Sequence, residues 1–325
     1  MHMAVVDAHL HVWCSEWPYA EGQAPDAALD GERRVGSAEA LLHHMDGAGV
    51  GRALIVQPIT YKHDHAYVAH CLTAWPQRFR GMALANPMLP APEAVAALRA
   101  VVLGASPVPC PDSSDVANGG AGAGGSRWTG VRFNPYLWPV ESGGMANATG
   151  RALFAEAGRL GLAVGFMTFK GLLPLADDIE ALLDSSPGTP AVLDHWGFFH
   201  QPPGQALADG GAPNEEAWAR LLDMGRRFPQ LHVKLSALFR VTGMGAGQAA
   251  DASYADLRPR LAALLEVFGA NRLMWGSDFP YVILEAGGYD GSKAALEAML
   301  TQLGAGEADT ALVLGGTAQK LFFSR

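Results

Sequence analysis

Cysteine and basic residues are scarce in this chain of 325 residues. The three cysteines, Cys14, Cys71 and Cys110, are odd in number and widely spaced, so they suit neither a disulfide framework nor a Cys-x-x-Cys zinc site. Lysine and arginine number 23 against 32 acidic residues, which gives a net charge of −9. A surface that binds nucleic acid through its phosphates needs clustered basic residues, so we expect no nucleic acid partner.

Long apolar runs and two nucleotide or esterase motifs are also missing. No uninterrupted apolar run reaches the roughly 18 residues of a membrane-spanning helix, and we expect no membrane partner. The amino terminus enters a β-rich run almost at once, without the charged and apolar regions of an export signal, so we expect a cytoplasmic protein. The absence of a Gly-x-x-x-x-Gly-Lys-Ser/Thr loop and of a Gly-x-Ser-x-Gly elbow argues against nucleotide hydrolysis and serine esterase chemistry.

Short β-rich runs alternate with longer helical patterns along almost the whole chain, which predicts a parallel sheet built from βα units. The expected strands are Val5–His9, Arg52–Gln57, Phe79–Ala85, Thr129–Asn134, Ala163–Phe169, Ala191–His195, Leu231–Leu235 and Arg272–Ser277. The expected helices are Ser37–Gly49, one beginning near Asp64, Pro92–Val102, Ala146–Leu160, Leu175–Leu183, Glu215–Phe228 and Tyr254–Phe268, with two closing helices at Ser292–Leu303 and Ala308–Phe322.

Eight such units with no second strand-rich block predict one (β/α)8 TIM barrel with loop insertions, forming a single domain over residues 1–325. Residues 104–126 are rich in glycine, alanine, serine and proline without periodicity, which predicts a flexible insertion. A second glycine-rich stretch covers Thr242–Gly247. We expect neither stretch to carry the chemistry.

Polar residues follow apolar runs at three predicted strand exits. His9 and His11 lie two residues apart at the end of the first run, and alternate residues of a strand share a face. His195 ends the sixth run and Asp278 follows the eighth. Because the carboxyl ends of parallel barrel strands meet at one rim, and the first and last strands are neighbours, we expect these four side chains to converge.

Six segments together resemble a known family. They are Asp7-Ala8-His9-Leu10-His11-Val12-Trp13, Gly130-Val131-Arg132-Phe133-Asn134, Leu193-Asp194-His195-Trp196-Gly197, Val233-Lys234-Leu235-Ser236, Gly276-Ser277-Asp278-Phe279-Pro280 and Leu314-Gly315-Gly316-Thr317-Ala318. In this order they resemble the amidohydrolase-related TIM-barrel hydrolases, and most of all the branch of 2-pyrone-4,6-dicarboxylate lactonase and sugar-acid lactonases.

The resemblance implies that His9, His11, His195 and Asp278 form the reaction centre of a hydrolase that opens a small, carboxylated lactone. Asp278 would take a proton from the attacking water, and the three imidazoles would polarise the carbonyl directly or hold a cation that does so. A relative in the same group of barrels is a decarboxylase, so a metal-dependent decarboxylase of a carboxylated semialdehyde is one alternative. A barrel that binds a ligand without turning it over is another.

The metal question stays open at the level of sequence. Three imidazoles and a carboxylate, His9, His11, His195 and Asp278, suit one zinc or manganese ion. The fifth predicted strand, however, lacks the histidine or lysine that metal-dependent members of the superfamily supply there. One divalent cation and none are therefore equally compatible with the sequence, and a binuclear site is disfavoured.

Candidate substrate-binding residues lie beside the same rim. An arginine such as Arg132 can clamp a carboxylate with two hydrogen bonds, or it can close a salt bridge at the rim. Asn134 and Ser236 are further candidates for contacting a small anionic substrate. Tyr61 and Asp64 are also candidates, with a polar loop and a cap of the next helix as their alternative roles. Lys234, inside a predicted strand, is expected to pair with an interior carboxylate or to contact substrate. The sequence does not indicate the oligomeric state.

Overall fold

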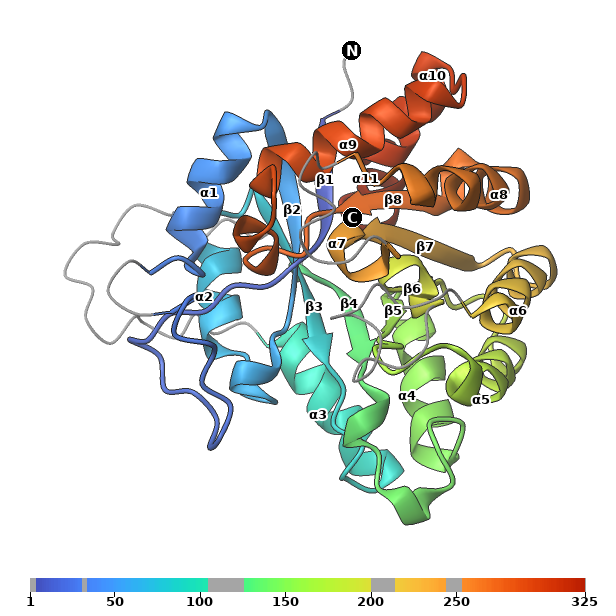
Figure 1. The fold of residues 1–325 in the computed structure, drawn as a ribbon. Coiled ribbons are helices and arrows are strands. Elements are labelled where there is room, and N and C mark those ends of the chain that lie inside the picture. The colour runs from blue at the N-terminus through green and yellow to red at the C-terminus, as the bar shows by residue number, and fades with distance from the viewer. Residues whose placement is uncertain (1–3, 31–33, 105–125, 200–213, 244–252, 325) are drawn as a thin grey trace.

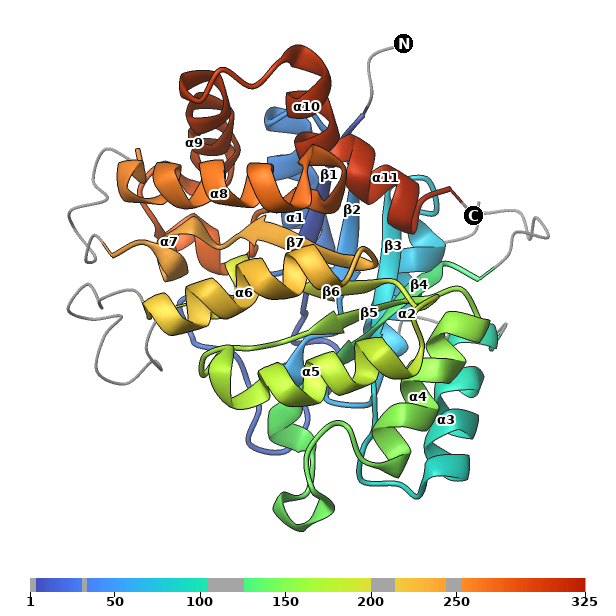
Figure 2. The same cartoon turned by 90° about the vertical axis from the view of Figure 1, so that its right-hand side faces the viewer.

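The computed structural model describes residues 4–30, 34–104, 126–199, 214–243 and 253–324. Its eight strands form one parallel sheet in chain order, with helices arranged around the outside (Figures 1 and 2). The strands are β1 (Val5–Leu10), β2 (Val50–Val56), β3 (Phe79–Leu84), β4 (Trp128–Phe133), β5 (Ala163–Phe166), β6 (Ala191–Leu193), β7 (Leu231–Ser236) and β8 (Leu273–Gly276). The predicted TIM barrel is confirmed.

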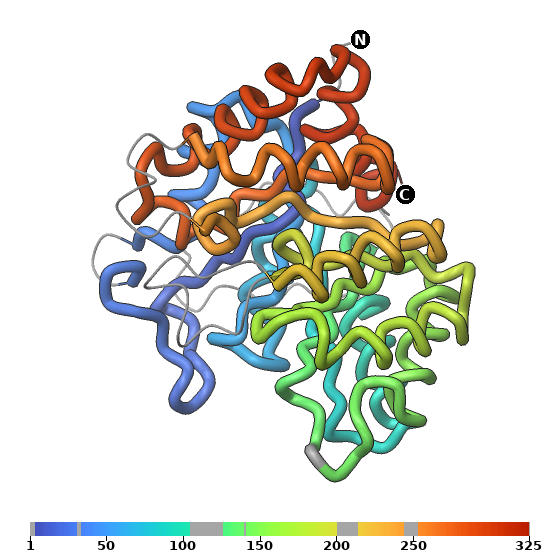
Figure 3. Tube along the Cα trace, turned by 45° about the vertical axis from the view of Figure 1, so that its right-hand side comes forward, coloured from blue at the N-terminus to red at the C-terminus, as the bar shows by residue number. Residues whose placement is uncertain are grey.

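The first and last strands meet just beyond the end of β8. The backbone amide of Asp278 donates to the His9 carbonyl oxygen at 2.9 Å, and the His11 amide donates to the Phe279 carbonyl oxygen at 2.8 Å. Leu10 and Phe279 form a parallel bridge. In Figure 3 the blue amino-terminal segment accordingly runs beside the orange segment that contains β8. Residues some 270 positions apart in the chain are thereby fixed at the same rim of the barrel.

The helices lie close to the predicted positions, apart from the single turn at Leu238–Val241, which was not predicted. They are α1 (Ala38–Gly47), α2 (Ala66–Ala74), α3 (Ala91–Leu103), α4 (Ala148–Arg159), α5 (Leu173–Ser185), α6 (Glu215–Arg227), α7 (Leu238–Val241), α8 (Arg258–Phe268), α9 (Gly288–Gln302), α10 (Glu307–Ala311) and α11 (Thr317–Phe322). Ser37 caps α1, because its side chain accepts a hydrogen bond from the Ala40 amide. Among the described residues, no helix is both long and apolar enough to cross a membrane.

Two predicted features differ from the structure. The closing helix expected at Ala308–Phe322 is divided into α10 and α11 by a π-helical turn at Leu312–Gly316. A side chain at Gly315 would collide with the Ala4 carbonyl oxygen, so the chain passes close to β1 at this turn. The fifth and sixth strands end earlier than predicted, at Phe166 and Leu193. The predicted insertion at 104–126 falls almost entirely on residues outside the described ranges.

The lower part of the barrel interior is apolar. Val6, Met82 and Met274 come from three strands and pack into one buried cluster with Phe322 of α11. Phe322 is fully buried, so α11 closes the amino end of the barrel with an aromatic side chain. Charged residues lie above this layer, toward the carboxyl ends of the strands.

Candidate active site

A β-bulge in β1 determines where its two histidines point. Asp7 pairs with Ala53 of β2 and Leu10 pairs with Ile55, so three steps along β1 match two along β2. Strict alternation from Val6, which lies in the interior cluster, would turn His9 outward. The extra residue reverses the phase, as bulges beside active sites often do, and His9 enters the barrel. The predicted sharing of a face by His9 and His11 therefore needs this bulge to become an interior pair.

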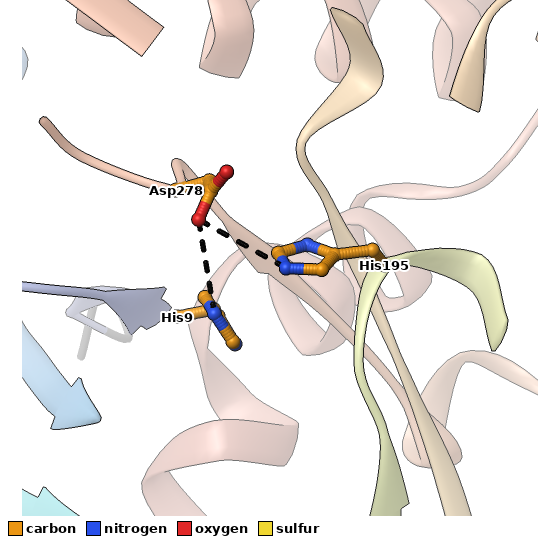
Figure 4. Close-up of side chains that lie close together, drawn as sticks. All are labelled: His9, His195 and Asp278. Carbon is orange, nitrogen blue, oxygen red and sulfur yellow. Dashed lines mark ion pairs between the residues drawn. The ribbon is translucent and has the colours of Figure 1, made fainter. Parts of the chain in front are cut away.

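Three imidazoles surround one carboxylate oxygen at the carboxyl end of the barrel. The Nε2 atoms of His9, His11 and His195 lie 3.8, 3.8 and 3.9 Å from Asp278 Oδ1. Figure 4 shows His9 and His195 directed toward Asp278 from different strands. All four side chains are buried. The structure thus brings together the four residues proposed as the reaction centre.

The strand exits that carry these residues have unusual backbone conformations. His195 begins four consecutive residues with positive φ, namely His195 at 47°, Trp196 at 59°, Gly197 at 70° and Phe198 at 46°. Asp278 has a φ of 63°. Residues other than glycine rarely adopt this left-handed backbone region, because it is strained for them. Backbone strain of this kind concentrates at functional sites. The geometry of the rim is therefore imposed by the surrounding barrel.

A buried ion cluster lies behind His9. Asp194 Oδ1 is 3.1 Å from His9 Nδ1 and 3.0 Å from Lys234 Nζ. Arg132 approaches the other carboxylate oxygen of Asp194 at 3.4 Å. Lys234 and Asp194 are fully buried, and this pairing is the interior salt bridge expected for Lys234. Asp194 was not among the predicted site residues, although it directly precedes His195 at a strand exit.

Burial changes the protonation of these groups. It lowers the pKa of His9, where it outweighs the opposite effect of Asp194. It also lowers the pKa values of His11 and His195 well below their usual range, with His9 adding to the effect. Burial by itself would raise the pKa of Asp194, but Lys234, His9 and Arg132 together hold that pKa well below its ordinary value. At neutral pH the three imidazoles are therefore neutral, and the nearby Asp194 is ionised.

The Nδ1 atoms of His11 and His195 also have polar neighbours within hydrogen-bonding distance. His11 Nδ1 lies 2.9 Å from the Val56 carbonyl oxygen. His195 Nδ1 lies 2.8 Å from Ser236 Oγ. Ser236 is fully buried, and among the described residues it contacts the centre through His195. Sequence reasoning proposed it as a substrate contact, whereas its described position orients His195.

A cavity of about 360 Å³ opens above the cluster. Polar groups and apolar groups both line it: His11, Thr60, Arg132, His195, Arg240 and Asp278 on one hand, and Trp13, Pro58, Ile59, Met167, Phe169, Phe198 and Tyr281 on the other. The volume is in the range of small-molecule sites. The neighbouring aromatic residues Trp196 and Phe199 lie outside this lining and pack in the hydrophobic core.

Arg240 is a site residue that sequence reasoning missed. Its Nε donates to Asp278 Oδ2 at 2.7 Å, and its guanidinium lies 4.6 Å from the centre of the Tyr281 ring. It belongs to α7, a single helical turn directly after β7. The only signal available in the sequence was an arginine four residues beyond Ser236 at a strand exit. Its partner is 38 residues further along the chain, so local sequence gave no indication of the contact.

Three predicted substrate contacts lie outside the set of described residues that line the cavity. The Tyr61 hydroxyl donates to the Cys14 carbonyl oxygen and accepts from the Cys14 amide. Asn134 accepts from the Tyr136 amide, and Asp64 accepts from the Ala66 amide. Backbone groups thus contact a polar atom of each of the three side chains, and for Tyr61 and Asp64 this fits the loop and cap roles weighed as the alternative. Arg132, by contrast, does line the cavity.

The donor set fits a divalent cation. His9, His195 and Asp278 offer ligand atoms that all lie within 4.8 Å of one another. His9 Nε2 is buried and has no hydrogen-bond partner among the described residues. Neutral imidazole nitrogens and a carboxylate oxygen are ligands of zinc. His11, whose Nε2 faces the same carboxylate oxygen, is the fourth candidate ligand.

Comparison with known proteins gives the family. The amidohydrolase family model matches residues 6–323. The chain belongs to the amidohydrolase family. No curated protein matches the sequence.

Several solved structures share the fold over nearly the whole chain. An amidohydrolase from Burkholderia multivorans with bound zinc has a TM-score of 0.72 at 19% identity, covering 98% of this chain and 99% of that one. A probable 2-pyrone-4,6-dicarboxylic acid hydrolase from Acinetobacter baumannii, with citric acid bound, has a TM-score of 0.68 at 17% identity, covering 98% and 99%. A 2,6-dihydroxybenzoate decarboxylase from Rhizobium has a TM-score of 0.59 at 14% identity, covering 98% of each chain.

Proposed function

We propose that this amidohydrolase is a hydrolase that opens a small, carboxylated lactone by attack of water, with Asp278 as the general base. The observation that carries the proposal is the placement of one carboxylate among three neutral imidazoles beneath a cavity that also presents Arg132 and Arg240. A base, groups that polarise a carbonyl and cations that bind a carboxylate are the parts this reaction requires.

In this mechanism the two oxygens of Asp278 have different tasks. Arg240 holds Oδ2 at 2.7 Å, which fixes the carboxylate and leaves Oδ1 facing the imidazoles. Oδ1 accepts a proton from the water molecule as its oxygen bonds to the lactone carbonyl carbon. Asp278 then returns that proton to the ring oxygen when the ring carbon–oxygen bond breaks. The product is a hydroxy acid, and the carboxyl group of Asp278 ends in its starting state.

The cavity suits a ring that carries negative charge. Arg132 and Arg240 supply cations, and Arg132 Nε has no hydrogen-bond partner among the described residues. Phe169, Phe198 and Tyr281 provide apolar surface for a flat ring. The names of the Acinetobacter relative and of its bound citric acid both refer to compounds with several carboxylates, which supports an anionic substrate.

A divalent cation has a consistent place in this site. His9, His11, His195 and Asp278 would hold it, and zinc is the ion bound in the Burkholderia relative. When bound, zinc supplies a Lewis acid that polarises a carbonyl oxygen and lowers the pKa of water.

The proposal is tested by supplying purified protein, with and without added zinc, with a panel of lactones and following acid release with a pH indicator. We expect ring opening of carboxylated lactones and at least tenfold slower opening of the matching uncharged esters. Carbon dioxide release from a carboxylated semialdehyde or hydroxybenzoate, without ring opening of any lactone, would instead establish the decarboxylase alternative. Binding of these acids without turnover of either kind would establish the ligand-binding barrel.

A further inference from the structure

The contact that Nδ1 makes can fix the hydrogen position on a neutral imidazole. A neutral imidazole carries one hydrogen, on either Nδ1 or Nε2. His11 Nδ1 contacts the Val56 carbonyl oxygen at 2.9 Å, and a carbonyl oxygen can only accept. His11 is therefore fixed with its hydrogen on Nδ1, and its Nε2 presents a lone pair toward Asp278.

His9 has two opposite partners at the same atom. Its Nδ1 lies 3.1 Å from Asp194 Oδ1 and 3.1 Å from Lys234 Nζ. An ionised carboxylate only accepts hydrogen bonds, and an ammonium only donates them. With its hydrogen on Nδ1, His9 donates to Asp194. With its hydrogen on Nε2, His9 accepts at Nδ1 from Lys234, so both tautomers are provided with a partner.

The choice matters at the other end of the ring. His9 Nε2 faces Asp278 Oδ1 at 3.8 Å and has no hydrogen-bond partner among the described residues. If Nε2 is bare in all three histidines, four electron-rich atoms face one another, and a cation is needed between them. If His9 carries its hydrogen on Nε2, the site has its own hydrogen-bond donor and needs no cation.

We propose that Lys234 and Asp194 are positioning residues that give His9 two working states. Without metal, Lys234 keeps the hydrogen on Nε2, which donates to the carbonyl oxygen of the substrate. With a divalent cation, Nε2 is a ligand and Asp194 accepts the hydrogen now carried by Nδ1, as carboxylates do for metal-binding histidines. The imidazole carries one hydrogen in both states, so the change exchanges hydrogens with water and leaves their number unchanged.

Lys234 and Asp194 act on the site through the side chains that they contact. Both contact His9, and Asp194 also lies 3.4 Å from Arg132. Lys234 and Asp194 are fully buried and lie outside the described lining of the cavity. The inference rests on the proposed function only for the identity of the oxygen that receives the Nε2 hydrogen. The tautomer itself can be measured without any substrate.

The test is nuclear magnetic resonance of the histidine ring nitrogens in ¹⁵N-labelled protein, with the His9 signals assigned by their loss in a His9→Gln variant. After chelation of metal, we expect the wild-type hydrogen on Nε2. Addition of zinc should move it to Nδ1. In chelated Lys234→Met it should lie on Nδ1, while Lys62→Met, a loop variant, should match the wild type. A hydrogen on Nδ1 in the chelated wild type overturns the proposal, and this arm needs no folded variant at Lys234 or Asp194.

Zinc affinity, measured by competition with a chromophoric chelator, separates positioning from packing. Asp194→Asn should weaken zinc binding about 10- to 100-fold, the usual effect of losing the partner of a ligating histidine. Lys234→Met should bind zinc at least as tightly as the wild type. Equal weakening in both variants would show a purely structural role and overturn the proposal. Failure of the lactone panel leaves these readouts unaffected, so the two proposals can fail separately.

Discussion

At the amino end of the strands, Val6, Met82 and Met274 pack against Phe322, whereas at the carboxyl end the same barrel buries Asp194, Lys234 and three histidines. Apolar burial stabilises a fold by roughly 25 cal/mol per Å². Buried charges are costly even when paired, and removing one partner is costlier still. The apolar layer at the amino end, the lower layer, therefore stabilises the fold. The charged layer at the carboxyl end, the upper layer, contains the candidate site and lowers the stability of the fold.

The largest expected effect is on activity in the upper layer. Asp278→Asn removes the proposed base while keeping the shape of the side chain, and we expect kcat to fall about 10³-fold, within the usual contribution of a general base. The melting temperature should also fall, because Arg240 loses its charged partner, so kcat is compared at a temperature where both proteins are folded. The measurement is steady-state kinetics on the best lactone of the panel beside a thermal unfolding curve.

Asp64→Asn is the matched control for this variant. Asp64 accepts from a neighbouring backbone amide and lies outside the described lining of the cavity, so its kcat should equal that of the wild type. An Asp278→Asn protein that kept a tenth of its activity would remove Asp278 from the role of base.

Phe322→Ala tests the lower layer in the opposite sense. Removing a fully buried aromatic side chain should lower the free energy of unfolding by about 3–5 kcal/mol, because a cavity remains. Activity per folded molecule should be unchanged. Urea unfolding and kinetics below the transition check both points, and Phe322→Leu should lose less. A folded Phe322→Ala protein with strongly reduced kcat would show that the two layers are coupled.

Asp7 offers a buried carboxylate to compare with Asp194. Its described partners are the His9 and Ser277 amides and the Tyr289 hydroxyl. Burial raises the pKa of Asp7 to about 6, against these hydrogen bonds, which lower it. Asp194, which has cationic neighbours, is shifted the other way.

The sign of the resulting pH effect follows from linkage. Between pH 4 and 6 the native Asp7 binds its proton more tightly than the unfolded chain does, so its contribution to stability falls as pH rises through this window. One pKa unit corresponds to about 1.4 kcal/mol. The free energy of unfolding of Asp7→Asn, relative to that of the wild type, should therefore rise by about 2–3 kcal/mol from pH 4 to pH 7. Urea unfolding of both proteins across this range measures it. A difference that stays constant with pH would contradict the expectation.

The smallest effect concerns strain at the mouth. Lys62, after the short turn Ile59–Tyr61, has φ 46° and ψ −119°, a combination that favours glycine. Lys62→Gly relieves the backbone strain in the folded state, but glycine also raises the conformational entropy of the unfolded chain. The net effect should be a free energy of unfolding about 1 kcal/mol higher than that of the wild type. Lys62→Ala keeps the strained conformation and should give no gain. Equal stability of the two variants in urea unfolding would rule out strain at this residue.

The fold and the four central residues could be predicted from sequence because their signals are local. Periodicity located the strands and helices, and Ser37 marked the start of α1 by its own chemistry. Strand exits identified His9, His11, His195 and Asp278, since the ends of parallel strands meet at one rim. Tyr61, Asn134 and Asp64 were proposed for the same reason, but each is hydrogen-bonded to backbone nearby in space.

By itself the sequence determined the (β/α)8 barrel, the family resemblance and which chemical groups reach the rim. Only the tertiary structure decided the bulge that turns His9 inward, the Arg240 contact with Asp278, and the position of His9 Nδ1 between Asp194 and Lys234. Periodicity and turn chemistry act between neighbours in the chain, so they can be read from it. The pairings depend on how the strands are registered around the closed barrel, and that register is fixed only when all eight strands are in place.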